Sequence, residues 1–230
     1  MSIFTIGDTH LSLSSDKPMD IFKGWSDYTK RLQLNWLAIV NENDTVVIPG
    51  DVSWAMDLQG AKKDFAFLNE LPGKKILLKG NHDYWWTTMT KMNEFLNENH
   101  FDSIQILFNN TIEVGDFAIC GTRGWFFDDD AKDAQKILAR EVGRLEMSIE
   151  CANKTGKEPI VFLHYPPINE FTSCEPIMKV LIENRIRRCY YGHLHGDSLK
   201  RAYRNEHYGI KFDVVSADFL EFCPKLIEKI

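Results

Sequence analysis

Five short polar motifs, each at the end of a brief hydrophobic run, constrain the fold of this chain most strongly. One of them, Gly80-Asn81-His82-Asp83, follows the apolar run 76–78 almost directly. The others are Asp8-Thr9-His10, Gly50-Asp51, His164 and Gly192-His193-Leu194-His195. Brief apolar runs that end in a turn indicate buried strands. In open α/β sheets, ligands bind outside the carboxyl ends of the strands. We therefore expect these motifs to meet at one site.

The first hundred residues alternate between two hydrophobic periods. Strands are expected at 3–6, 45–48 and 76–78, where the residues are apolar and often β-branched. Helices are expected at 27–40, 58–71 and 85–96, where apolar residues recur at helical spacing. Strand and helix in alternation are typical of a mostly parallel sheet with right-handed crossovers, so the chain is expected to belong to the α/β class.

In the middle of the chain, short predicted strands replace the alternation of strand and helix. Short strands are expected at 104–108, 111–114 and 117–120, and the turn-forming pairs Asn109-Asn110 and Gly115-Asp116 separate them. Such pairs favour hairpins and therefore antiparallel pairing. The remaining elements are predicted in a fixed order. They are a helix at 130–153, a strand at 160–163, a helix at 177–182, a strand at 189–191 and closing strands at 210–216 and 219–222.

Composition narrows the class of protein. The 230 residues have no break in composition, which favours one domain over 1–230. Hydrophobic residues make up 44% and charged residues 26%, as in ordinary globular proteins. The formal net charge of −6 argues against a protein that coats nucleic acid, because such binding rests on many Lys and Arg contacts to phosphates.

Cysteine use and hydropathy bear on the compartment. The five cysteines form no CxxC pair, and an odd count without a framework suggests a reducing compartment. The sequence enters a strand at Ile3, which leaves no room for a signal peptide. No apolar run approaches the roughly 18 residues that a membrane helix needs. We therefore expect a cytoplasmic protein without a membrane partner.

The side chains at the strand ends suggest a metal site. Taken singly, such a residue is more often a helix cap, a turn residue or a hydrogen-bonded histidine than a functional group. Together, histidine and carboxylate without thiolate suit zinc, iron, manganese or nickel. Four His, two Asp and one Asn exceed the needs of a single tetrahedral ion. A shared carboxylate would let two ions sit about 3.5–4 Å apart, an arrangement suited to phosphate chemistry.

The five polar motifs named above resemble those of the calcineurin-like metallophosphoesterases, in the same order and across nearly the whole chain. Three further stretches are similar to a bacterial branch of that superfamily whose substrate is unassigned. They are the segment 50–56, Trp85-Trp86 and Gly121-Thr122-Arg123-Gly124-Trp125. At Ser53-Trp54 the sequence departs from the better-known branches. The resemblance implies a four-layer αββα sandwich of two mixed sheets flanked by helices.

The resemblance also implies two divalent metal ions, with Mn²⁺ favoured and Fe or Zn as alternatives. On its pattern, one ion would be held by Asp8, His10, Asp51 and His195. The other would be held by Asp51, Asn81, His164 and His193. Asp51 would be the shared ligand. We therefore predict a metal-dependent phosphoric ester hydrolase, either a phosphatase or a phosphodiesterase.

The expected reaction is attack on phosphorus by a hydroxide that bridges the two ions. The leaving oxygen needs a proton, and His82, which is outside the expected ligand set, is the candidate general acid. Asp83 is expected to hold the His82 ring in the right tautomer. A helix N-cap is the alternative role for Asp83, and the two roles are compatible.

Substrate contacts are open to two interpretations. Arg123 could bind a substrate phosphate with its bidentate fork, or it could pair with Asp128, Asp129 or Asp130. Trp85 and Trp125 could stack on a flat, nucleotide-like leaving group, or they could pack in the core. The same applies to the neighbouring aromatic residues Trp54, Trp86, Phe126 and Phe127. A non-catalytic metal-binding scaffold or regulatory interaction module of the same fold remains the alternative function.

Overall fold

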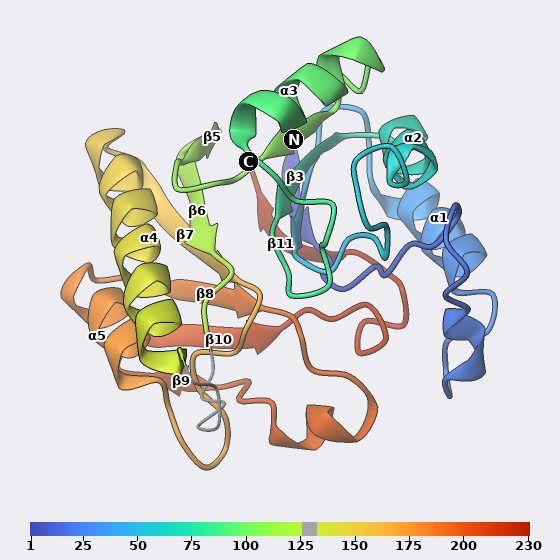
Figure 1. The fold of residues 1–230 in the computed structure, drawn as a ribbon. Coiled ribbons are helices and arrows are strands. Elements are labelled where there is room, and N and C mark those ends of the chain that lie inside the picture. Colours follow the sequence, from blue (N-terminus) through green and yellow to red (C-terminus); the bar gives the residue numbers. More distant parts are fainter. Residues whose placement is uncertain (126–132) are drawn as a thin grey trace.

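The computed structural model describes residues 1–125 and 133–230, and it contains two β-sheets packed face to face (Figure 1). The first sheet has five strands. In spatial order they are β11 (Lys225–Lys229), β1 (Ser2–Thr5), β2 (Thr45–Pro49), β3 (Lys74–Leu78) and β4 (Ile104–Ile106). Only the β1–β11 pair is antiparallel. The alternation of strand and helix in the first hundred residues therefore gives the parallel pairing expected from it.

The second sheet has six strands. In spatial order they are β5 (Ile112–Val114), β6 (Phe117–Thr122), β7 (Glu158–Leu163), β8 (Arg188–Tyr191), β10 (Ile210–Val214) and β9 (Glu206–His207). The edge strands β5 and β9 are antiparallel to their neighbours, and the inner pairs are parallel. Both sheets are therefore mixed.

Helices cover the outer face of each sheet (Figure 1). The first sheet carries α1 (Tyr28–Ile39), α2 (Lys62–Glu70) and α3 (Met89–Glu98), and the second carries α4 (Ala134–Lys154) and α5 (Glu175–Glu183). Two short 3₁₀ helices, η1 (Met19–Ile21) and η2 (Gly196–Arg201), lie in loops. Within the described residues, no helix is long and apolar enough to cross a bilayer.

Three hydrophobic clusters hold these layers together. One joins α1–α3 to the first sheet, and another joins α4 and α5 to the second. The third lies between the sheets, where Ile3, Val47 and Ile76 meet Ile119 and Phe162. These five side chains are fully buried. This layering confirms the predicted four-layer α/β sandwich.

Three predictions about elements were wrong. The Asn109-Asn110 turn does not make a hairpin, because β4 pairs in parallel with β3 and the chain then crosses to the other sheet. The segment 219–222 is a turn in which Glu221 and Phe222 have positive φ, and the closing strand is β11. Helix α3 begins at Met89 rather than near 85, because Thr88 caps it by accepting a hydrogen bond from the Lys91 N–H.

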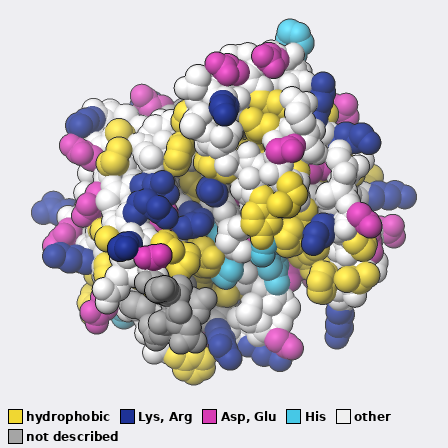
Figure 2. Space-filling view, in the orientation of Figure 1, with side chains coloured by type: hydrophobic (Ala, Val, Ile, Leu, Met, Phe, Trp, Pro, Cys, Tyr) yellow, Lys and Arg dark blue, Asp and Glu magenta, His cyan; other side chains and the backbone are white. Residues whose placement is uncertain are grey.

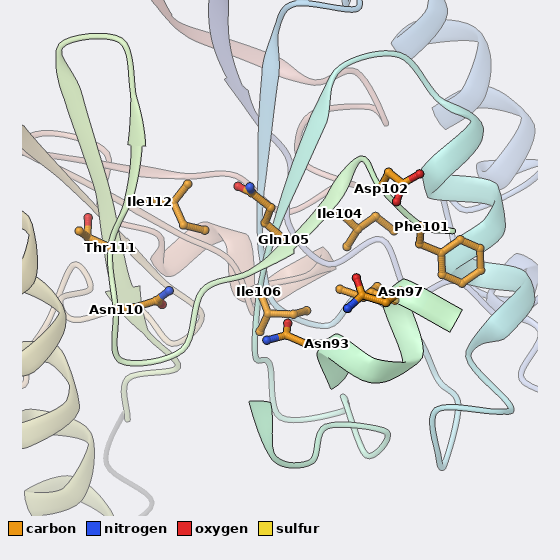
Figure 3. Close-up of a pocket in the computed structure, with 11 residues that line it drawn as sticks. Asn93, Asn97, Phe101, Asp102, Ile104, Gln105, Ile106, Asn110, Thr111 and Ile112 are labelled. Atoms are coloured by element: carbon orange, nitrogen blue, oxygen red, sulfur yellow. The ribbon is translucent and has the colours of Figure 1, made fainter. Parts of the chain in front are cut away.

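The edge strands β4 and β5 border a cavity of about 540 Å³ together with α3 (Figure 3). Its lining is rich in amides, including Asn93, Asn97, Gln105 and Asn110. None of the residues that line it carries a polar motif from the strand ends. We assign it no role in the site described below.

Candidate metal centre

The carboxyl ends of strands from both sheets bring the polar motifs together. Asp8 and His10 follow β1, Asp51 follows β2, and the segment 80–83 follows β3. His164 follows β7, while His193 and His195 follow β8. Backbone hydrogen bonds join the two sheets at this end, because the Gly7 N–H donates to the Val215 carbonyl at 2.7 Å. The site therefore lies at the junction of the sheets.

Within residues 1–125 and 133–230, three overlapping groups of side chains are close enough to hold a metal ion. Within each group the candidate ligand atoms lie within 4.8 Å of one another. The groups are Asp8–His10–His195, His10–Asp51–His82 and Asp8–Asp51–His164. Because Asp8, His10 and Asp51 each belong to two groups, the three form one continuous cluster.

The set expected for the first ion is compact. His10 Nε2 lies 3.3 Å from His195 Nε2 and 3.6 Å from Asp51 Oδ2. His195 Nε2 lies 3.5 Å from Asp8 Oδ1. Asp8, His10 and His195 thus form one close group, and Asp51 approaches it through His10.

The set expected for the second ion is organised around an amide oxygen. Asn81 Oδ1 lies 2.6 Å from His164 Nε2 and 2.9 Å from His193 Nδ1. His164 Nε2 also lies 3.6 Å from Asp51 Oδ1. The two oxygens of Asp51 therefore face different histidines, since Oδ2 is the one close to His10. This is the geometry that a shared ligand needs.

Four of the seven expected ligands have left-handed backbone conformations. The φ angles are 56° at Asp8, 43° at His10, 50° at Asp51 and 71° at His193. Positive φ costs on the order of 1–3 kcal/mol for a residue with a side chain, and it concentrates at functional sites. Four strained residues in one cluster are typical of a functional site, where the surrounding structure keeps side chains in positions that the backbone alone would not favour.

Two motif glycines are required by close packing against the carboxylates. A Cβ on Gly80 would lie 2.1 Å from Asp51 Oδ1, and one on Gly192 would lie 2.3 Å from Asp8 Oδ2. Real Cβ atoms do not approach other atoms so closely, so only glycine fits at either position. The glycines in these motifs therefore set the positions of the two Asp side chains.

Hydrogen bonds outside the cluster orient two of the histidines. His164 Nδ1 lies 3.1 Å from the carbonyl of Pro49, and His195 Nδ1 lies 2.9 Å from Asp218 Oδ1. When Nδ1 of the neutral ring donates in these bonds, Nε2 is the ligand atom, and at His195 a metal ion would have to displace the Nε2 proton. Sequence reasoning missed Asp218. Only an alignment of relatives could have given a signal for it, because it lies in the C-terminal tail outside every motif.

The histidines differ in their electrostatics. Burial lowers the pKa of His10 to about 4, and burial with the nearby His164 lowers the pKa of His193 to about 4. At His195, burial also favours the neutral form, but Asp8 and Asp218 outweigh it and raise the pKa to about 10. Asp8 is buried as well, yet His195 and His164 hold its pKa below the usual value.

His82 and Asp83 are not partners, which corrects the role predicted for Asp83. The Asp83 carboxylate is buried and accepts five hydrogen bonds, none of them from the His82 ring. The donors are the backbone N–H groups of Gly80, Asp51, Val52 and Ser53 and the indole of Trp85. The His82 ring instead lies against Asp51, with Nδ1 2.7 Å from Oδ2. Asp83 therefore shapes the loop and does not orient the imidazole.

The aromatic residues of the motifs divide into buried and partly exposed groups. Trp85 is 1% exposed, donates to Asp83 and packs edge-on against Phe65, so it belongs to the core and is closed to a substrate. Trp54 is half-buried and stacks on His10. Trp125 is half-buried and lies 5.6 Å from the Tyr165 ring, which in turn contacts His193. Phe126 and Phe127 lie outside the described residues.

Arg123 belongs to a group of cations beside the cluster. Its guanidinium lies 3.6 Å from the buried Glu141, which also pairs with Arg144. Lys79 is near enough for the charges of both arginines to lower its pKa, in addition to the effect of burial. Arg123 Nε is buried and has no hydrogen-bond partner in the described chain. Pairing of Arg123 with Asp128, Asp129 or Asp130 concerns residues outside the described part.

The donor set fits divalent cations. His10 and His193 are neutral near pH 7 and offer lone pairs, and the buried carboxylates of Asp8 and Asp51 supply negative charge. The ring nitrogens of His10 and His195 face each other at 3.3 Å, a spacing that suits two ligands of one ion. Histidine and carboxylate donors without thiolate match manganese, iron or zinc.

Comparison with known proteins agrees with this geometry. A family model described as calcineurin-like phosphoesterase matches residues 1–197. A comparison with curated proteins gave no match. Among solved structures, a protein of unknown function from Aquifex aeolicus is 18% identical with a TM-score of 0.51, and the match covers 98% of this chain and 95% of that one. A phosphopantetheinyl hydrolase from Mycobacterium tuberculosis is 13% identical with a TM-score of 0.53 and the same coverage. At these identities the structures establish similarity of fold alone.

Proposed function

The chain belongs to the calcineurin-like phosphoesterase family, and on that premise we propose that it hydrolyses a phosphomonoester or phosphodiester at a pair of divalent ions. Membership of the family supports a metal-dependent phosphoesterase. That two ions bind at the site is our proposal. The observation that supports it is the placement of Asp51, whose Oδ2 lies 3.6 Å from His10 Nε2 and whose Oδ1 lies 3.6 Å from His164 Nε2. A carboxylate that approaches one histidine of each proposed set with a different oxygen is placed to be shared by two ions.

The proposed ligands fall into two sets that share Asp51. Asp8, His10 and His195 complete one set. Asn81, His164 and His193 complete the other. When bound, two divalent ions supply hydroxide from water near neutral pH and neutralise the phosphoryl oxygens. Mn²⁺ is the proposed metal, with Fe and Zn as alternatives of the same ligand preference.

His82 is the proposed general acid. Its side chain is 33% exposed, whereas the carboxylate of Asp51 beside it is buried. The 2.7 Å contact between His82 Nδ1 and Asp51 Oδ2 holds the ring beside the reaction centre. The imidazole can then give a proton to the leaving oxygen, which an ester with a poor leaving group requires. Asp83 acts on this step only indirectly, through the loop that carries His82.

Arg123 is proposed to bind an anionic part of the substrate. The cations Arg123, Arg144 and Lys79 share one buried carboxylate, Glu141, so positive charge is in excess. The Arg123 side chain is 18% exposed, so its guanidinium can still donate to a phosphate or carboxylate oxygen of a substrate. On the face drawn in Figure 2, Lys and Arg side chains gather on one side of the exposed histidines. Trp125 stands beside this group, since Arg123 lies over its ring at 5.5 Å.

Two coarser expectations accompany this proposal. All five cysteines are free, which suits the reducing conditions of the cytoplasm. The acidic balance of the chain disfavours a nucleic-acid polymer as substrate, although a small nucleotide-like ester is compatible with it. A non-catalytic metal-binding scaffold is the alternative function. The proposed acid His82 disfavours this alternative, because a scaffold needs no proton donor at the centre.

The test is hydrolysis by protein that has been stripped with a chelator and then reloaded with Mn²⁺, Fe²⁺ or Zn²⁺. We expect turnover of 4-nitrophenyl phosphate or bis(4-nitrophenyl) phosphate only after reloading. A phosphopantetheine ester belongs in the same panel, because one structural neighbour is a phosphopantetheinyl hydrolase. Equal activity in stripped protein would rule out the mechanism. Bound metal without turnover of any ester would favour the scaffold.

A further inference from the structure

A cavity of about 360 Å³ opens directly beside the candidate metal centre. His10, His82 and His195 form its wall on that side. The opposite wall comes from the segment 19–25 and from Trp54. Its volume is at the low end of the roughly 300–1,000 Å³ typical of small-molecule sites. We propose that this cavity binds an apolar leaving group, so that the substrate is a phosphate ester of a hydrophobic alcohol or phenol. This inference rests on the proposed function.

The position of His82 decides which part of the substrate enters the cavity. A general acid must lie within hydrogen-bond reach of the leaving oxygen. His82 lines the cavity and also contacts Asp51 of the metal centre. With phosphorus at the metal centre and the leaving oxygen at His82, the carbon skeleton attached to that oxygen extends into the cavity.

The walls of the cavity are mostly aromatic. Trp54 stacks on His10 with ring centroids 5.0 Å apart, and its Nε1 is directed to the sulfur of Met19 at 3.3 Å. Trp25 is 3% exposed and contacts the rings of His10 and His195 at 5.8 Å and 5.6 Å. These contacts fix the positions of Trp25 and Trp54 against the histidines of the metal centre.

The polar groups of the cavity offer little to a polar leaving group. Both oxygens of Asp218 are already engaged, one by His195 Nδ1 and the other by the Gly196 N–H. Lys23 also lines the cavity, and its ammonium, which makes no side-chain hydrogen bond or ion pair within the described residues, is left to donate to a ligand. A sugar or amino-acid alcohol carries several polar groups, so most of its hydrogen bonds to water would not be replaced here, which costs binding energy.

Exposed apolar side chains continue from the cavity to the surface. Phe22 lines the cavity and is 53% exposed, and its neighbour Ile21 is 74% exposed. Tyr84 is 52% exposed, and its ring lies edge-on to the His82 ring with centroids 6.2 Å apart. In Figure 2 hydrophobic side chains border the exposed histidines on the side away from the Lys and Arg group. Apolar side chains that are exposed next to a cavity favour its use as a binding site.

The test compares phosphonates, whose P–C bond the enzyme does not hydrolyse, by titration calorimetry with Mn²⁺-loaded protein. The ligands are 1-naphthylmethylphosphonate, octylphosphonate and 2-hydroxyethylphosphonate. We expect at least one apolar ligand to bind roughly tenfold or more tightly than the hydroxyethyl ligand. The naphthyl and octyl arms distinguish an aromatic from an aliphatic leaving group.

A matched pair of variants locates the effect. Phe22→Ser should weaken the preferred apolar phosphonate by roughly three- to tenfold. Phe171→Ser, at a residue that is 82% exposed and does not line the cavity, should leave its affinity unchanged. In metal-free protein, 1-naphthylmethanol should bind to the parent chain and bind more weakly to Phe22→Ser.

The outcomes separate the two proposals. Equal affinity for all three phosphonates, or the same loss in both variants, would overturn the apolar cavity while leaving the metal centre in place. If no phosphonate bound to the metal-loaded protein, the proposed function would fail, and the inference would fail with it.

Discussion

The backbone N–H of Asp51 donates a 2.9 Å hydrogen bond to Oδ2 of Asp83, although the two residues are 32 positions apart. The same carboxylate oxygen accepts a 2.7 Å hydrogen bond from the Gly80 N–H. Asp83 therefore ties the loop after β2 to the loop after β3. Because Asp51 is the proposed shared ligand, the position of both ions depends on this buried carboxylate.

Replacement of Asp83 by Ala should disrupt the fold around the site. Several buried N–H groups would lose their acceptor, and each buried unpaired group costs about 1–3 kcal/mol. We expect Asp83→Ala to lower the free energy of unfolding by about 3–5 kcal/mol and to reduce metal content, measured by urea unfolding and elemental analysis. A stable, fully metallated variant with slow turnover would instead support a role for Asp83 in orienting His82.

His82→Ala and Asn81→Ala should have different effects, although the residues are adjacent. Loss of the proposed acid should leave both metals bound and slow hydrolysis of an alkyl phosphate by roughly 10²–10⁴-fold. Hydrolysis of an ester with a good leaving group should be affected much less, because that oxygen needs no proton. Asn81→Ala should instead lower the affinity of the protein for one of the two ions. Equal slowing of both esters by His82→Ala, or loss of metal, would contradict the acid role.

Gly192→Ala should damage the metal centre without touching a ligand. The added Cβ would lie 2.3 Å from Asp8 Oδ2, so the carboxylate must move. We expect a large loss of metal affinity by titration with Mn²⁺. Gly143→Ala is the matched control, because a Cβ there meets nothing within 4 Å in the middle of α4. It should stabilise the protein by about 1 kcal/mol. Unchanged metal binding in Gly192→Ala would refute the packing argument.

Lys75 should make stability depend on pH in the alkaline range. It is fully buried, its Nζ donates to the carbonyls of Leu71 and Gly73, and burial lowers its pKa from 10.5 to about 8. Between pH 8 and 10.5 the unfolded chain binds more protons at this group, so stability should rise with pH by up to about 3 kcal/mol. Urea unfolding at pH 7.5 and 9.5 should detect this rise in the parent chain and a smaller one in Lys75→Met. Equal slopes would contradict it.

Much of the site could be predicted from the sequence because strand ends are local signals. Short apolar runs placed Asp8, Asp51 and Asn81 at the carboxyl ends of parallel strands, and such ends meet in space whatever the details of the loops. The class of the fold followed from the same periodicity. These inferences needed no knowledge of long-range pairing.

The errors arose where long-range contacts outweigh local pattern. Asp83 is next to His82 in sequence, but its acceptors are satisfied mainly by backbone donors from the loop after β2. Trp85 has helical spacing with later apolar residues, yet Asp83 and Phe65 hold it in a turn before α3. Asp218 carries no local signal at all, because its role depends on the position of His195. Such partners become visible only in three dimensions.

The most direct test of the central claim is the number of metal ions per chain, together with activity, in Asp51→Asn and in a surface control. Asp57 is exposed, so Asp57→Asn should keep two ions and full hydrolysis of 4-nitrophenyl phosphate. Asp51→Asn should lose at least one ion and slow turnover by at least about 10³-fold. Two tightly bound ions and undiminished hydrolysis in Asp51→Asn would contradict the proposed dinuclear centre.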